Sequence, residues 1–308
     1  MTRTDPVGST GGKHSAPAMA ANSASTTTVD PGAGSAPSPG SGGRQRVTGV
    51  NAAGRARIGA RTLRTDRWWL PQLVTGAVLA LFAIYATLRA FQNGDYYSEP
   101  YLTPLYSPCL STRCVPNASD FGTPVGHWFP LSPAIIVLIF PLGFRMTCYY
   151  YRKAYYRAFW MSPPACAVAE PHARYSGETR FPLILQNIHR YFWYVAMLFS
   201  VILTYDALLG FRNERGQWGH AGLGTVILLV NAALIWAYTL SCHSCRHITG
   251  GRLKHFSQHP IRYWAWTKVS KLNARHMQLA WASLVWLVVT DFYIFLLARG
   301  TLSDLRFF

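Results

Sequence analysis

The chain has 308 residues, of which half are hydrophobic, 14% aromatic and only 13% charged, a composition that excludes an ordinary soluble domain of this size. Its formal net charge of +17 would suit a nucleic-acid binder, but the basic residues are concentrated in alternate loops between long apolar segments. We therefore expect a membrane protein and no nucleic-acid partner.

The first 66 residues differ in composition from the rest of the chain. They are rich in Ser, Gly, Ala, Pro and Thr, carry scattered basic residues and almost lack large apolar side chains. Such a segment buries too little apolar surface to offset the entropy lost on ordering. Residues 1–66 are predicted to be a disordered cytoplasmic tail, and residues 67–308 a membrane domain.

Five apolar stretches are long enough to cross about 30 Å of hydrocarbon as helices of roughly 20 residues. They run from Trp69 to Phe91, Leu131 to Tyr151, Ile188 to Phe211, His220 to Cys245 and His276 to Ala298. The predicted fold is all-α, a polytopic membrane protein built as a bundle of five transmembrane helices.

The basic residues predict the orientation of this bundle. Nine Lys and Arg precede the first span, five lie in loop 149–187 and seven in loop 246–275. The loops on the other side carry five: Arg113, Arg212, Arg215, Arg299 and Arg306. By the positive-inside rule, the N-terminus is cytoplasmic and the C-terminus external.

This topology places two cysteines on the external side. Cys109 and Cys114 lie in the first external loop, which faces an oxidising compartment. We expect them to form a small disulfide loop, with metal binding as the minor alternative.

The other four cysteines lie on the predicted cytoplasmic side, where thiols stay reduced: Cys148, Cys166, Cys242 and Cys245. His243 and His247 lie beside the last two, and thiolates and imidazoles are the ligands of iron–sulfur, haem and zinc sites. For any one of these residues, packing or snorkelling is the simpler interpretation. For the group, we favour metal ligation.

Several separated motifs resemble the membrane-anchor, cytochrome b-like subunit of succinate dehydrogenases and fumarate reductases, in particular an actinobacterial form with five spans. The motifs are residues 145–157 (RMTCYYYRKAYYR), 163–168 (PPACAV), 185–191 (LQNIHRY), 241–244 (SCHS) and Arg246 with His247. The resemblance covers about residues 68–300. It implies a multi-pass protein of the cell membrane that docks a flavoprotein and an iron–sulfur subunit and passes electrons from succinate to quinone. It implies no dehydrogenase chemistry in this chain alone, and it leaves the oligomeric state of the complex open.

The resemblance also bears on the cofactor. The first span lacks the histidine expected of members with two haems b, so we expect instead a Rieske-like [2Fe–2S] cluster with mixed cysteine and histidine ligands. The first ligand set is Cys148, Cys166, His243 and His247, with Cys242 and then Cys245 as substitutes. In the alternative, a haem b takes its ligands from His189, His243, His247 and His276.

Quinone reduction needs hydrogen-bond donors and apolar walls near that centre. The candidates are Arg145, Tyr150, Trp160, His189 and Arg190, although a basic residue or histidine at a helix end is equally an interface anchor. A hypothesis of another class, a membrane scaffold or transporter without a redox centre, also stays open.

Overall fold

The computed structural model describes residues 64–110, 132–168, 183–213 and 215–308. Every described residue belongs to one compact unit, residues 51–308. Nearly all of the predicted tail, together with Cys114, lies outside the described residues.

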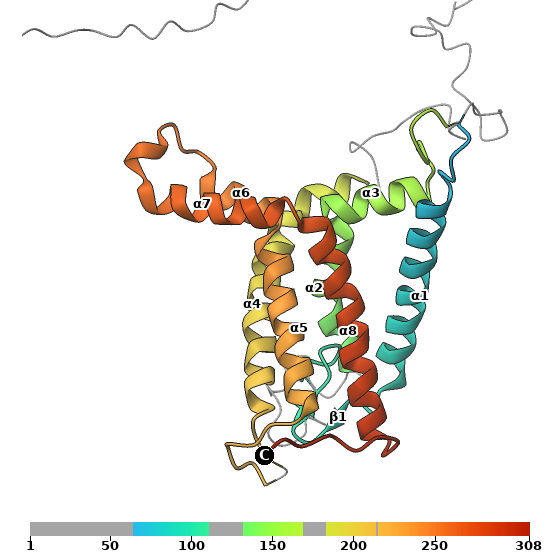
Figure 1. The fold of residues 1–308 in the computed structure, drawn as a ribbon, viewed down its shortest axis with the longest axis vertical. Helices are drawn as coiled ribbons and strands as arrows, with labels where there is room; N and C mark the ends of the chain where they lie inside the picture. The colour runs from blue at the N-terminus through green and yellow to red at the C-terminus, as the bar shows by residue number, and fades with distance from the viewer. Residues whose placement is uncertain (1–63, 111–131, 169–182, 214) are drawn as a thin grey trace, which may run out of the picture. The chain divides into compact units, whose positions relative to one another are not determined.

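Within the described residues, four helices are long and apolar enough to cross a membrane. They are α1 (Leu70–Gln92), α4 (His189–Leu209), α5 (Leu223–Leu240) and α8 (His276–Ala298), and a short 3-10 helix, η2 (Leu183–Ile188), leads into α4. A further helix, α2 (Pro133–Thr147), packs against α4 (Figure 1). The predicted all-α polytopic membrane fold is confirmed.

Two of the predicted spans are broken helices. The span predicted from Leu131 to Tyr151 ends at Thr147, and after Cys148 the chain turns by 75° into α3 (Tyr149–Ala158). The span predicted to reach Cys245 ends at Leu240 and is followed by α6 (His243–Gly250). In both places one extended residue, Cys148 or Cys242, interrupts the helical backbone.

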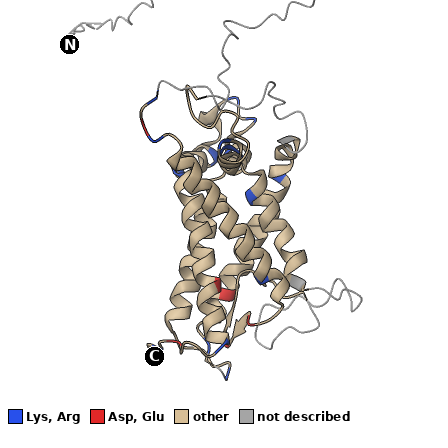
Figure 2. Ribbon diagram, turned by 90° about the vertical axis from the view of Figure 1, so that its right-hand side faces the viewer, with Lys and Arg blue, Asp and Glu red and all other residues tan. Residues whose placement is uncertain are grey.

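Short helices lie across one end of the bundle. There α3, α6 and α7 (Pro260–Asn273) run roughly perpendicular to the long helices (Figure 1), and a 3-10 turn, η3 (Phe256–Gln258), precedes α7. Lys and Arg gather mostly at this end, whereas the length of the bundle is almost free of charge (Figure 2). We call it the basic end; the positive-inside rule predicts that it is cytoplasmic.

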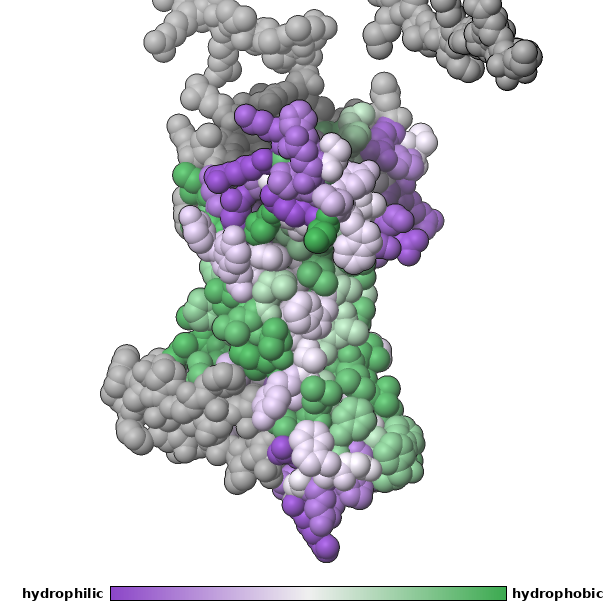
Figure 3. Space-filling model, turned by 90° about the vertical axis from the view of Figure 1, so that its left-hand side faces the viewer, coloured by the Kyte–Doolittle hydropathy of each residue, from purple (hydrophilic) through white to green (hydrophobic). Residues whose placement is uncertain are grey.

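Large apolar side chains cover the outside of the bundle. Leu81, Leu88, Tyr191 and Leu198 are all more than half exposed. Hydrophobic residues form a broad surface along the helices, with hydrophilic residues at both ends (Figure 3). Because a soluble protein rarely exposes so much apolar surface, this belt is the part of the protein that faces lipid.

The opposite end is held by a buried ion pair. Arg89 of α1 donates from Nε to Asp291 of α8 at 2.8 Å, and both side chains are almost fully buried. Tyr85 and Thr103 also donate to this carboxylate. A two-stranded ribbon, β1 (Tyr97–Ser98) and β2 (Tyr101–Leu102), lies next to this network. These contacts join α1 and the ribbon to α8.

Candidate metal centre

Two cysteines lie at the helix breaks of the basic end. Cys148 precedes α3 and Cys242 precedes α6, and both have extended backbone torsions, with ψ of 134° and 146°. Each sulfur therefore faces the N-terminus of a helix. The backbone N–H of Ser244 donates to Cys242 Sγ at 3.3 Å. N–H groups and the positive end of a helix stabilise a thiolate, which is the form of cysteine that binds metals.

Two histidines face these sulfurs from the first residues of two long helices. His276, at the start of α8, has Nε2 at 3.2 Å from Cys148 Sγ. His189, at the start of α4, has Nε2 at 2.9 Å from Cys242 Sγ. Four separate helix ends thus bring two thiols and two imidazoles into two Cys–His pairs.

The other nitrogen of each imidazole is held by a hydroxyl group. Thr147 Oγ1 lies 2.8 Å from His189 Nδ1, and Ser241 Oγ lies 2.7 Å from His276 Nδ1. Each hydroxyl belongs to the residue that immediately precedes one of the two cysteines. A hydrogen bond at Nδ1 fixes the ring and leaves Nε2 free for a ligand, as around metal-binding histidines generally.

Aromatic rings hold the imidazole planes. Phe144 stacks on His189 with ring centroids 5.0 Å apart, and Tyr238 stacks on His276 at 5.2 Å. Phe144 and Tyr238 each lie four residues before a cysteine of the site. The segments Phe144–Cys148 and Tyr238–Cys242 therefore use the same pattern, an aromatic residue followed by a hydroxyl residue and a cysteine, to build corresponding parts of the site.

Three of the four residues of the site are buried, and His189 is partly exposed. Cys148 and Cys242 are each 1% exposed and His276 is 6% exposed. Burial raises the pKa of the Cys242 thiol to about 12, although the N–H groups of Ser244 and Cys245 act in the opposite direction. A free Cys242 thiol therefore stays protonated at neutral pH, and metal binding would have to displace the proton.

The donor set fits an iron–sulfur cluster better than a single metal ion. Within the described ranges, no three Cys, His, Asp or Glu side chains converge to hold one ion. A [2Fe–2S] cluster instead takes two protein ligands on each iron, and the site supplies two thiols and two imidazoles. The buried hydroxyl of Tyr238 lies beside Cys148 and has no nitrogen or oxygen partner among the described residues. It is a hydrogen-bond donor available to a sulfur atom.

The predicted ligands fall into two groups. Cys148 and the first substitute, Cys242, lie in the buried site, and His189 and His276, expected only as haem ligands, lie with them. Cys166 is exposed, and its backbone carbonyl accepts a hydrogen bond from Arg64 at 2.9 Å. The structure thus brings together two of the predicted cysteines but leaves Cys166 outside the buried group.

The remaining members of the predicted set line the edge of the site. His243 is exposed, with its ring 6.4 Å from that of His276. His247 Nδ1 accepts a hydrogen bond from exposed Arg190, and Cys245 is buried in α6. These residues lie on the outer side of the two Cys–His pairs.

The quinone candidates are spread over the basic end. Tyr150 accepts a hydrogen bond from Trp281 at 2.5 Å, and Trp160 is exposed at the end of α3. Arg145 points into the bundle, where it donates to Ser283 at 3.1 Å.

A cavity of about 350 Å³ adjoins the site. It is lined by His243, Arg246, His247, Gly250, Gly251 and Trp266. The Arg246 guanidinium lies over the Trp266 ring at 5.3 Å. A Cβ on Gly250 would come within 2.1 Å of the Trp266 ring, so glycine is required there for the ring to pack. Trp266 was not predicted as a site residue, because no sequence pattern indicates that α7 packs against α6.

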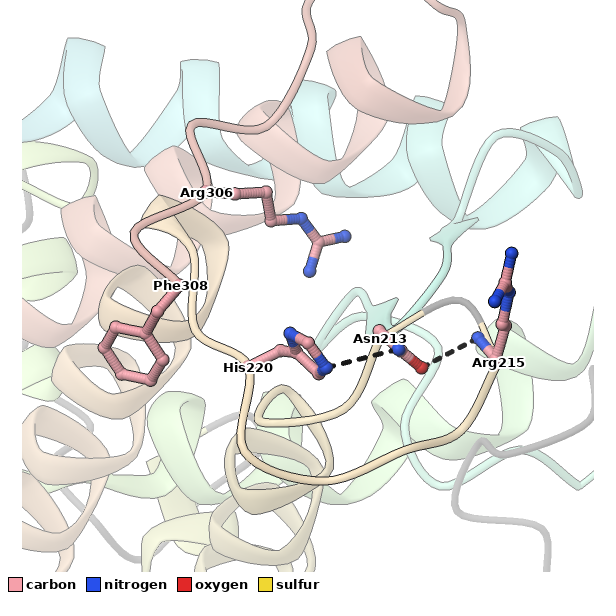
Figure 4. Close-up of a pocket in the computed structure, with 5 residues that line it drawn as sticks. All are labelled: Asn213, Arg215, His220, Arg306 and Phe308. Carbon is pink, nitrogen blue, oxygen red and sulfur yellow. Dashed lines mark hydrogen bonds between the residues drawn. The ribbon is translucent and has the colours of Figure 1, made fainter.

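A second recess lies at the opposite end of the bundle (Figure 4). Its volume is about 310 Å³, and Asn213, Arg215, His220, Arg306 and Phe308 line it. His220 makes a hydrogen bond with Asn213 at 3.2 Å. This recess has no cysteine in its lining and is separate from the candidate metal centre.

Cys109 forms a disulfide, as predicted, and its expected partner Cys114 lies outside the described residues.

Comparisons with known proteins agree with this architecture. Residues 70–300 match the family of the actinobacterial succinate dehydrogenase subunit SdhC. The chain belongs to this family. It is therefore a membrane-anchor subunit of a succinate dehydrogenase, an oxidoreductase complex. A search of curated proteins found no match.

A solved structure extends the SdhC assignment to three dimensions. A chain of the Mycobacterium smegmatis Sdh1 complex in the apo form is 62% identical in sequence, with a TM-score of 0.76. The alignment covers 84% of this chain and 99% of that chain.

Proposed function

We propose that this SdhC-family chain anchors a flavoprotein and an iron–sulfur subunit at the plasma membrane and passes electrons from succinate to quinone through a Rieske-like [2Fe–2S] cluster. The observation that carries the proposal is the buried convergence of Cys148 with His276 and of Cys242 with His189. We expect no dehydrogenase chemistry in this chain itself.

The proposed ligands are these four residues rather than the set chosen from the sequence. In a Rieske-like arrangement two thiolates bind one iron and two imidazoles bind the other, so the present Cys–His hydrogen bonds would be replaced by bonds to iron. Thr147 and Ser241 would hold the two imidazoles through Nδ1. The bound cluster would supply one-electron transfer between a donor in the partner and quinone.

Within the described part of the chain, we place the quinone headgroup in the cavity next to His243. Trp266 offers a ring face, and Arg246 and the two histidines offer hydrogen-bond donors for carbonyl oxygens. Its lining residue His243 lies one residue after the proposed ligand Cys242. A headgroup bound there would be close enough to the cluster to receive its electrons.

The basic end is the proposed docking surface for the two soluble subunits. Basic residues lie on both α3 and α7, together with the exposed aromatic residues Tyr149, Tyr263 and Trp264. Aromatic and arginine side chains are enriched in protein interfaces, and a basic surface guides an acidic partner into register.

Low-temperature EPR of the purified complex tests the cluster. The reduced wild type should give a Rieske-like signal in addition to any signals from partner clusters. Cys242→Ser should abolish that signal, whereas the matched variant Cys166→Ser should retain it. If Cys166→Ser loses the signal and Cys242→Ser keeps it, the proposed ligand set is wrong.

The haem alternative is separated by an optical measurement. A haem b bound among His189, His243, His247 and His276 would give a Soret band, which a [2Fe–2S] cluster lacks. A complex in which this chain contributes neither a Soret band nor a Rieske-like signal would instead support a scaffold without a redox centre.

A further inference from the structure

Arg145 is a cation that points into the bundle beside the candidate metal centre. It lies in the last turn of α2, three residues before Cys148. Its guanidinium donates to the hydroxyl of Tyr151 at 3.1 Å, to Ser283 Oγ at 3.1 Å and to the carbonyl of Ala280 at 3.4 Å. These contacts fix the charge between α2, α3 and α8.

All of these partners are neutral. Among the described residues, no carboxylate pairs with Arg145, whereas the other inward-pointing arginine of the bundle, Arg89, has Asp291 at 2.8 Å. A guanidinium held in an apolar bundle without a counter-charge is costly, and such a charge usually marks a functional site. The arrangement suggests that an anionic group normally lies near Arg145.

The geometry shows where that anion would be. The Arg145 guanidinium carbon lies 4.7 Å from the centroid of the Tyr238 ring, and the same ring stacks on His276. Tyr238 thus contacts both the arginine and a proposed iron ligand. Arg145 also lies close enough to Cys148 and His276 to act on both electrostatically.

The proposed cluster is the group near Arg145 whose charge changes during electron transfer. With two thiolates and two neutral imidazoles, a [2Fe–2S] centre is neutral when oxidised and carries one negative charge when reduced. The added electron stays on the iron pair, and no bond needs to break. In apolar surroundings a nearby fixed cation stabilises the reduced form strongly, because the interaction is weakly screened.

Resting on the proposed function, we infer that Arg145 is the counter-charge of the reduced cluster and raises its midpoint potential. Its role is to tune the potential rather than to bind iron or quinone. The feature of the structure that supports this inference is a guanidinium with only neutral hydrogen-bond partners, one aromatic ring away from a proposed imidazole ligand.

An EPR-monitored redox titration of the purified complex tests this inference. Arg145→Gln should lower the equilibrium constant for cluster reduction about tenfold, which is about 59 mV for one electron. Arg145→Lys, which keeps the charge, should recover part of the shift. The matched control is Arg215→Gln, which removes an exposed charge at the opposite end of the bundle and should leave the midpoint potential unchanged.

A second variant covers the case in which Arg145→Gln fails to assemble. Ser283→Asp would place a carboxylate against the Arg145 guanidinium and neutralise it in place, so it should lower the potential in the same direction. A potential unchanged in both variants overturns the inference. So does an unchanged potential with a raised KM for quinone, because Arg145 would then be a quinone-binding residue.

These outcomes differ from a failure of the proposed function. If the wild-type complex has no Rieske-like signal, there is no potential to titrate and the proposed function itself is wrong. If the signal is present but its midpoint potential does not change when Arg145 is replaced, the cluster is supported and the inference about Arg145 is wrong.

Discussion

Removing the hydroxyl of Ser241 should weaken the metal centre without removing a ligand. Ser241 Oγ lies 2.7 Å from His276 Nδ1 and also donates to the carbonyl of Tyr238. In Ser241→Ala the imidazole loses the contact that fixes its orientation. Loss of such an outer hydrogen bond typically costs about 10–100-fold in metal affinity. This corresponds to about 1.4–2.8 kcal/mol.

The assay is retention of the cluster during exposure to an iron chelator. The Rieske-like EPR signal and acid-labile sulfide are measured over time in wild type and variant. Thr147→Val provides a matched test, because it removes the corresponding hydroxyl from His189, and it should weaken retention to a similar extent. Ser270→Ala, which removes a hydroxyl that contacts Arg246 instead, is the control.

The result that would refute this reasoning is specific. If Ser241→Ala and Thr147→Val lose the cluster no faster than wild type and Ser270→Ala, the two hydroxyls do not orient iron ligands. His189 and His276 would then be histidines of the packed core, and the proposed ligand set would have to be abandoned.

Three further predictions follow from other contacts. Arg89→Met leaves the Asp291 carboxylate buried without its cation and should destabilise the membrane domain by about 3–5 kcal/mol; thermal unfolding of the solubilised complex measures this, and a melting temperature equal to wild type would contradict it. Trp266→Ala should raise the KM for quinone several-fold with little change in the EPR signal, and steady-state kinetics with a soluble quinone would show otherwise if Trp266 only packs. Gly250→Ala should displace the Trp266 ring and produce the same defect, so a normal KM in this variant would argue against the cavity as the quinone site.

The transmembrane segments could be predicted well from apolar run length. The helices from Leu70, His189 and His276 begin within one residue of their predicted starts. The break points were not predicted from run length, because each predicted span was carried past the end of its helix, to Tyr151 and to Cys245. Nothing in hydropathy marks a residue whose backbone becomes extended at the end of the membrane.

The composition of the site could be predicted, but its membership only in part. Assigning each residue to a side of the membrane placed the free cysteines and most histidines at one end. Choosing among them by proximity in sequence favoured His243 and His247, which lie beside Cys242 on a short helix. The structure instead places the first residues of two long helices, His276 and His189, beside Cys148 and Cys242, although they are distant in sequence.

A short sequence pattern is repeated before the two cysteines of the site. The pattern of an aromatic residue, two residues, a hydroxyl residue and a cysteine occurs at Phe144–Cys148 and again at Tyr238–Cys242. Each is followed by a histidine at the start of the next long helix. A search for repeated short patterns around the cysteines would have selected the four residues that the structure brings together.

The crossed arrangement of these pairs has a consequence for assembly. Each hydroxyl holds a histidine from its own half of the membrane domain, whereas each cysteine faces the histidine of the other half. An iron–sulfur cluster at this place would connect α2–α4 to α5–α8 through its ligands. Neither half could retain the cluster alone, so cluster insertion would require that both halves had already packed together in the bilayer. Iron shortage would then weaken the contact between the two halves rather than any single helix.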